Sequence, residues 1–128
     1  MLFDTDVLIW LFRGNSRSAE VVEAELERQI SIVSYMELIQ GAKNRQEART
    51  IRGFLKEYGF ELLALTENIG HRAAIYIDEY SLVSGLRMAD ALVAATASEN
   101  RTALCTSDYG HYRALKDIEI IRFRPAQS

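Results

Sequence analysis

The sequence predicts one α/β domain that spans residues 1–128, a three-layer α/β/α sandwich with a mainly parallel central sheet. Short apolar segments alternate along the chain with longer segments whose apolar residues recur at helical spacing. This alternation is typical of a parallel sheet covered on both faces. A chain of 128 residues, 48% of them apolar, can supply one hydrophobic core but is short for two domains.

Five short apolar runs are the predicted strands. Most are rich in Leu, Ile, Val or Phe, which suits strands that are buried on both faces of a sheet. The predicted strands are residues 1–3, 30–34, 60–65, 102–107 and 118–123.

Four helices are predicted in the first half of the chain. The stretch Gly14–Asn15–Ser16 separates the first two, and glycines at 41 and 59 end the next two, since glycine commonly follows a last helical turn. The predicted ranges are 7–12, 18–29, 34–40 and 44–59. The core side of the fourth helix carries Ile51, Phe54, Leu55 and Tyr58.

Two further helices are predicted in the second half. Residues 67–80 carry four apolar residues at helical spacing, so this helix presents one apolar side to the sheet. These residues are Ile69, Ala73, Ile77 and Tyr80. Residues 87–100 are rich in alanine, which favours a helix.

Charge and cysteine content exclude several classes of protein. A net charge of −3 argues against a generic basic nucleic-acid binder, although a local basic surface is compatible with nucleic acid. The single cysteine, Cys105, permits no internal disulfide, and we expect it to be buried in its apolar run. The chain shows neither a signal peptide nor a run of about 20 apolar residues, so we expect a cytoplasmic protein without a membrane partner.

Five acidic residues fall where the sites of parallel sheets form. Asp4 and Asp6 follow the first predicted strand, Glu37 follows the second, and Asp108 follows the fourth. Asp90 opens the alanine-rich helix. Because ligands bind beyond the carboxyl ends of parallel strands, we expect these side chains to lie close together.

Each of these acids also fits a purely structural role. Ser34 and Glu37 match a capping box, in which the acid returns to the backbone N–H of the N-cap residue. Asp6 and Asp108 fit N-caps, each worth about 1 kcal/mol. Asp90 fits a first helical turn, where a carboxylate complements the helix dipole.

Taken together, the acids indicate a divalent metal site. Carboxylates that converge repel one another and raise each other's pKa, and a bound cation removes the conflict. Oxygen ligands from Asp and Glu favour Mg²⁺, or Mn²⁺, over Zn²⁺. The chain has one cysteine and two histidines without metal-binding spacing, so it offers no competing set of ligands.

Four motifs in order resemble the PIN-domain ribonucleases, and most of all the small VapC-type toxins of toxin–antitoxin pairs. They are LFDTDVLIW, SYMELIQGA, RMADALVAATA and TSDYGHY, and the resemblance covers essentially the whole chain. It implies an Mg²⁺- or Mn²⁺-dependent endoribonuclease that often forms a homodimer and is held inactive by a cognate antitoxin. The catalytic and metal-binding acids that it implies are Asp4, Glu37, Asp90 and Asp108.

The chemistry of the site suggests a role for each of these acids. We expect Asp4 and Asp90 to bind metal directly, Glu37 to bind metal or act as general base, and Asp108 to hold a second, weaker metal. Thr5 could support the site by hydrogen bonds to these ligands.

Three more residues lie near the motifs. Thr106 could also position a ligand. Asp6 stands where the family more often has a small polar residue, and it fits either a ligand through water or a cap. We expect His111 to be a surface or phosphate-contacting residue, not a ligand.

A basic stripe in the fourth predicted helix is a candidate contact for RNA or the antitoxin. Its residues are spaced by three or four, so they share one side of the helix, which also suits an ordinary solvated basic face. They are Arg45, Arg49, Arg52 and Lys56.

Two other families remain as alternatives. In a haloacid-dehalogenase-like phosphatase, Asp4 would be the nucleophile and Asp6 the acid/base, but that family needs a downstream lysine and a late pair of acids. A receiver-type binding domain needs an aspartate after the third strand and a lysine after the fifth, and neither is present there. Both alternatives leave Glu37 and Asp90 without a role.

Overall fold

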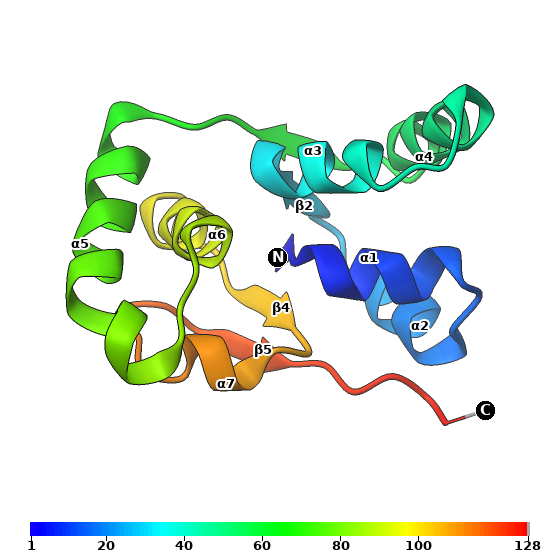
Figure 1. The fold of residues 1–128 in the computed structure, drawn as a ribbon. Coiled ribbons are helices and arrows are strands. Elements are labelled where there is room, and N and C mark those ends of the chain that lie inside the picture. Colours follow the sequence, from blue (N-terminus) through cyan, green and yellow to red (C-terminus); the bar gives the residue numbers. More distant parts are fainter. Residues whose placement is uncertain (128) are drawn as a thin grey trace.

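A five-stranded parallel sheet forms the centre of the computed structural model, which describes residues 1–127 (Figure 1). The strands lie in the order β3-β2-β1-β4-β5, and every neighbouring pair is parallel. Their bounds are β1 Leu2–Phe3, β2 Gln29–Ser31, β3 Glu61–Leu63, β4 Leu104–Thr106 and β5 Ile120–Arg122. The first strand lies at the centre of the sheet, so the residue that follows it lies at the middle of the sheet's carboxyl edge.

Seven helices in the described residues surround the sheet. Figure 1 shows α5 and α6 on one side of the strands, with α1 and α2 on the other. The bounds are α1 Thr5–Phe12, α2 Ser16–Ala24, α3 Ile32–Gln40, α4 Arg45–Glu57, α5 Glu67–Ser84, α6 Met88–Glu99 and α7 Tyr109–Tyr112. The predicted class, an α/β/α sandwich, is confirmed, and the sheet is parallel throughout these residues.

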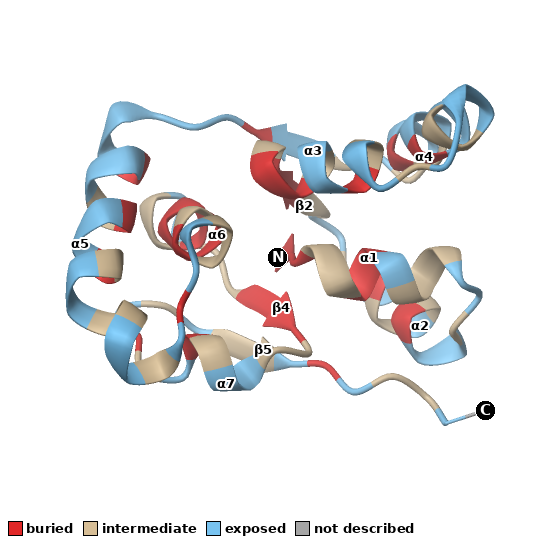
Figure 2. Cartoon of the chain, viewed as in Figure 1, coloured by how far each residue is buried: buried red, intermediate tan, exposed pale blue. Residues whose placement is uncertain are grey.

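Each face of the sheet buries its own apolar cluster. Leu2 and Leu104 pack with residues of α5 and α6, whereas their neighbours Phe3 and Cys105 pack with residues of α1 to α4. Successive strand residues point to opposite faces, so even a two-residue strand contributes to both clusters. Figure 2 shows the buried residues along β4 and α6. Cys105 is fully buried as expected, and burial raises the pKa of its thiol to about 12.

The predicted start of the third helix is wrong by two residues. The sequence suggests a strand over 30–34 and an N-cap at Ser34, but the strand ends at Ser31, whose hydroxyl accepts the Val33 N–H at 3.1 Å. Ser34 therefore lies inside α3 and is fully buried. The proposed capping box between Ser34 and Glu37 is not formed, because neither residue lies at the helix end.

Other boundaries differ for local reasons. The second helix, predicted over 18–29, spans Ser16–Ala24, because the Asn15 side chain accepts the first free N–H groups. Helix α5 runs beyond residue 80 to Ser84, where Gly85 adopts a left-handed conformation with φ of 74°. The short helix α7 was not predicted. Within residues 1–127, no helix is long and apolar enough to cross a membrane.

Candidate active site

Asp4 lies at the carboxyl end of the central strand and is the N-cap of α1. Its Oδ1 accepts the Thr5 N–H at 2.9 Å. Its Oδ2 accepts hydrogen bonds from the Thr106 hydroxyl at 2.8 Å and the Tyr112 hydroxyl at 3.0 Å. Only 8% of the residue is exposed. Asp4 is therefore a buried carboxylate held by groups from three elements.

The surroundings of Asp4 disfavour its negative charge. Burial, and then the negative charge of Asp6, raise its pKa from the ordinary 3.8 to about 7, although the hydrogen bonds from Thr106, Thr5 and Tyr112 oppose the shift. A nearby cation would offset both causes of the shift. The electrostatics of this position thus suit a metal ligand.

Asp90 lies in the first turn of α6 and faces the same hydroxyl as Asp4. Asp90 lies in the first helical turn as predicted, and its Oδ2 also accepts the N–H of the N-cap residue Arg87 at 3.1 Å, a contact that was not predicted. Its Oδ1 lies 3.3 Å from the Tyr112 hydroxyl. Asp4 and Asp90 therefore meet on either side of one tyrosine hydroxyl.

Tyr112 contacts two of the predicted acids and is not among the residues that the sequence suggests. It is fully buried, and burial together with the charges of Asp4 and Asp90 raises the pKa of its phenol far above the usual value. Its neighbour Tyr109 in the same helix is instead exposed, with the Arg122 guanidinium 5.0 Å from its ring. No local pattern in the sequence distinguishes the two tyrosines.

Asp108 and His111 form the outer side of the site. Asp108 occupies the N-cap position of α7, but its side chain makes no capping hydrogen bond, so the predicted cap is absent. Its Oδ2 lies 2.7 Å from Nδ1 of His111, which lies 3.2 Å from Oδ2 of Asp90. Neither contact has hydrogen-bond geometry, so His111 attracts the acids only when its ring is protonated. The His111 side chain is 35% exposed, which agrees with a position at the surface, while its Nδ1 is buried between the two carboxylates. Its contact with phosphate stays a prediction.

Glu37 reaches the site from α3. Its Oε1 accepts a hydrogen bond from the Thr5 hydroxyl at 2.7 Å, directly beside Asp4. The side chain is exposed and lines a groove of about 740 Å³ between α1, α3 and α4. Thr5 thus makes a hydrogen bond to one of the predicted acids, and its role in positioning a ligand stays a prediction.

Asp6 connects two segments of the chain through hydrogen bonds. It is not the N-cap of α1, because Asp4 occupies that position. Its Oδ1 accepts the Val7 N–H at 2.8 Å, and its Oδ2 accepts both the N–H and the hydroxyl of Ser107. Asp6 therefore ties α1 to the segment after β4, and its oxygens are already engaged.

The four predicted acids are linked by bridging side chains. The Tyr112 hydroxyl contacts Asp4 and Asp90, and Nδ1 of His111 lies close to Asp90 and Asp108. The Thr5 hydroxyl connects Glu37 to the start of α1. These acids are Asp4, Glu37, Asp90 and Asp108. Within residues 1–127, no three acidic, histidine or cysteine side chains are close enough to form a finished metal site. The donors are nonetheless carboxylate oxygens, the type that Mg²⁺ and Mn²⁺ prefer.

The basic stripe of α4 does not face the groove beside Glu37. All four of its residues are exposed, but the groove is lined by other residues of α4, including Glu47, Thr50 and Phe54. At 100° per residue, the stripe projects from the far side of the helix. The stripe consists of Arg45, Arg49, Arg52 and Lys56.

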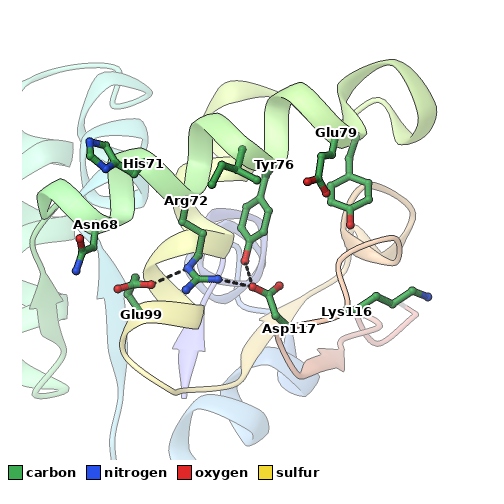
Figure 3. Close-up of a pocket in the computed structure, with 10 residues that line it drawn as sticks. Asn68, His71, Arg72, Tyr76, Glu79, Glu99, Lys116 and Asp117 are labelled. Carbon is green, nitrogen blue, oxygen red and sulfur yellow. Dashed lines mark hydrogen bonds and ion pairs between the residues drawn. The ribbon is translucent and has the colours of Figure 1, made fainter.

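A second cavity, of about 630 Å³, contains none of the predicted acids (Figure 3). Its centre is the Arg72 guanidinium, which lies 2.6 Å from both Glu99 and Asp117. The Tyr76 hydroxyl donates to Asp117 at 2.7 Å. These groups satisfy one another, which indicates a structural network joining α5, α6 and the segment before β5.

The family profile of the PIN domain matches residues 1–116. The chain belongs to the PIN domain family. The resemblance seen in the sequence is thereby confirmed, and the match removes the basis for the phosphatase and receiver-type alternatives. PIN domains are of the nuclease type and generally use divalent metal ions. No curated protein sequence matches the chain significantly.

Solved structures share the fold of this PIN domain. A toxin–antitoxin complex from Klebsiella pneumoniae is 28% identical, with 94% of each chain covered and a TM-score of 0.79. VapBC-1 from nontypeable Haemophilus influenzae is 21% identical, with 94% of this chain and 96% of that chain covered and a TM-score of 0.79. DNA-bound VapBC from Salmonella typhimurium is 20% identical with the same coverage and a TM-score of 0.80.

Proposed function

We propose that this PIN domain is a metal-dependent endoribonuclease and the VapC-type toxin of a toxin–antitoxin pair. The observation that carries the proposal is the meeting of Asp4 and Asp90 at the buried Tyr112 hydroxyl, at the carboxyl edge of the sheet. Family membership supports nuclease chemistry at this edge.

The acids would have different roles in phosphodiester hydrolysis. Asp4 and Asp90 would hold Mg²⁺, or Mn²⁺, and Asp108 would complete an outer, weaker position. A bound divalent ion lowers the pKa of water and neutralises charge on phosphate oxygens. The 45% exposure of the Asp108 side chain, against 21% for Asp90, supports its outer role.

Glu37 would act on the attacking water. Its exposed carboxylate is oriented by Thr5 and can accept a proton from that water. As the water oxygen bonds to phosphorus, the bond from phosphorus to the 3′ oxygen breaks. The leaving oxygen takes a proton from solvent, so the products carry a 5′-phosphate and a 3′-hydroxyl.

The proposed protein partners are a cognate antitoxin and a second copy of this chain. The structural neighbour at 28% identity is a toxin–antitoxin complex, which supports the antitoxin. Exposed apolar residues near the site support self-association, since Leu82, Val83 and Met88 are 100%, 81% and 74% exposed. Met88 lies two residues before Asp90, in the same first turn of α6.

End-labelled RNA and DNA of matched sequence test this function. The wild-type protein should cut RNA internally in Mg²⁺, and mapping should find 5′-phosphate and 3′-hydroxyl ends. The Asp4→Asn protein, purified in parallel, should cut neither the RNA nor the DNA. Equal cleavage by Asp4→Asn would assign the activity to a contaminant, and release of phosphate from monoesters without RNA cleavage would support a phosphatase instead.

A further inference from the structure

The Tyr112 hydroxyl connects the two acids at the centre of the proposed site. It lies 3.0 Å from Oδ2 of Asp4 and 3.3 Å from Oδ1 of Asp90. Tyr112 is fully buried, and its contact with Asp4 is buried with it, whereas the Asp90 side chain is 21% exposed.

The three groups come from three separate elements. Asp4 follows β1, Asp90 lies in the first turn of α6, and Tyr112 ends α7. The other anchors are local to each acid, since Thr106 donates to Asp4 and the Arg87 N–H donates to Asp90. Among residues 1–127, Tyr112 is the residue that hydrogen-bonds to both acids.

The phenol is well suited to act as a permanent donor. A tyrosine hydroxyl has an ordinary pKa of about 10, so at neutral pH it carries a proton that it can donate to a carboxylate. One proton serves one acceptor at a time, which means that the hydroxyl can alternate between the carboxylates while holding both within reach.

We propose that Tyr112 is a positioning residue that holds Asp4 and Asp90 in the relative orientation needed to bind a divalent metal ion. The inference rests on the proposed metal-dependent nuclease. Tyr112 acts through the two carboxylates and touches neither metal nor RNA. Loss of such an outer hydrogen bond typically weakens metal binding by about 10–100-fold.

The chain offers a matched control in Tyr76. This residue is also buried, and its hydroxyl also donates to a carboxylate, that of Asp117 at 2.7 Å. Figure 3 shows the pair in the separate cavity around Arg72. Tyr76→Phe therefore removes the same chemical group from a comparable environment away from the predicted acids.

Titration calorimetry of Mn²⁺ binding to the metal-free full chain tests the inference without RNA. Tyr112→Phe should bind Mn²⁺ at least about tenfold more weakly than wild type, and Tyr76→Phe should match wild type. In RNA cleavage, the Mn²⁺ concentration for half-maximal rate should rise by the same factor for Tyr112→Phe, while KM for RNA at saturating Mn²⁺ stays unchanged.

Three results would overturn the inference. Equal Mn²⁺ affinity of Tyr112→Phe and wild type would remove the role of Tyr112 and leave the proposed function standing. Equal weakening by Tyr112→Phe and Tyr76→Phe would show a general structural effect. A wild-type protein that binds no Mn²⁺ would overturn both this inference and the proposed function.

A fluorine label provides a second measurement if Tyr112→Phe does not fold. With 3-fluorotyrosine placed at position 112, the ¹⁹F resonance should move on Mg²⁺ titration, because the carboxylates that accept its hydrogen bond take up the ion. The same label at position 76 should not move. A ¹⁹F resonance at position 112 that does not shift at saturating Mg²⁺ would contradict the inference.

Discussion

The Thr5 hydroxyl donates a 2.7 Å hydrogen bond to Oε1 of Glu37. This contact joins the first turn of α1, directly after Asp4, to the middle of α3. Glu37 is exposed, so the bond gives an otherwise mobile carboxylate a fixed direction beside the other acids. The relationship explains how a residue on a separate helix, at the edge of a groove, can take part in one site.

Replacing Glu37 by Gln should abolish most of the activity and leave the fold intact. The residue caps no helix end, and the amide can still accept the Thr5 hydrogen bond, so the melting temperature should stay near that of wild type. The rate of RNA cleavage should fall by about 10²-fold or more, the range expected for loss of a general base. Glu47→Gln, in the same groove, is the control and should cut normally. Wild-type cleavage by Glu37→Gln would remove the residue from the site.

Thr5→Val should reduce cleavage through Glu37. The change preserves shape but removes the donor, so Glu37 loses its orientation and the rate should fall by about tenfold. Thr5→Ser restores a hydroxyl and should recover most of the rate. Combining Thr5→Val with Glu37→Gln should cost little more than Glu37→Gln alone, because both changes affect one interaction. Fully additive losses in the double variant would show that the two residues act separately.

Asp4 should make the metal-free protein less stable as pH rises. Its folded pKa of about 7 lies above its ordinary 3.8, so the folded state binds the proton more tightly than the unfolded chain. The stabilisation of the folded state by protonated Asp4 is fully present below about pH 3.8 and is lost as pH rises to about 7. One pKa unit corresponds to about 1.4 kcal/mol, which bounds the change at about 4 kcal/mol.

Asp4→Asn removes this titration and provides the measurement. The free energy of unfolding of Asp4→Asn minus that of wild type, without metal, should increase between about pH 4 and pH 7. Added Mg²⁺ should raise the melting temperature of wild type and leave that of Asp4→Asn unchanged. A difference that stays flat across this pH range would show that the folded protein imposes no penalty on the Asp4 charge.

The sequence predicted the architecture because that information is local. Alternating strands and helices defined the sandwich, and Asp4 and Asp108 were placed at strand ends from short apolar runs alone. The predicted start of α3 is too late because the β-branched residues Ile32 and Val33 favour a strand. The cap by Ser31 begins the helix at Ile32 instead.

The contacts within the site could not be predicted for a different reason. Tyr112 contacts Asp4, which is 108 residues away in the chain, and the motifs at the strand ends do not predict this contact. The position of His111 between Asp90 and Asp108 depends on α7, a four-residue helix without a clear periodic pattern. Sequence patterns thus predict the acids of the site, whereas the contacts that Tyr112 and His111 make with them depend on the tertiary structure.

Asp90 and Asp108 should differ in how strongly they affect activity. Asp90 is bound by the central hydroxyl and its side chain is 21% exposed, whereas the side chain of Asp108 is 45% exposed and makes no capping hydrogen bond. Asp90→Asn should lower cleavage by about 10³-fold, and Asp108→Asn by about tenfold with a higher Mg²⁺ requirement. Asp78→Asn, on the exposed side of α5, is the neutral control. A larger loss for Asp108→Asn than for Asp90→Asn would reverse the assigned order.

The measurement that tests the central claim most directly is RNA cleavage by one wild-type preparation before EDTA, in EDTA, and after excess Mg²⁺ or Mn²⁺ is restored. Asp90→Asn, purified in parallel, reports contaminating nuclease. The account predicts that cleavage stops in EDTA, returns with either ion, and stays absent for Asp90→Asn throughout. Undiminished cleavage in EDTA by wild type, with an inactive Asp90→Asn preparation beside it, would contradict a metal-dependent site.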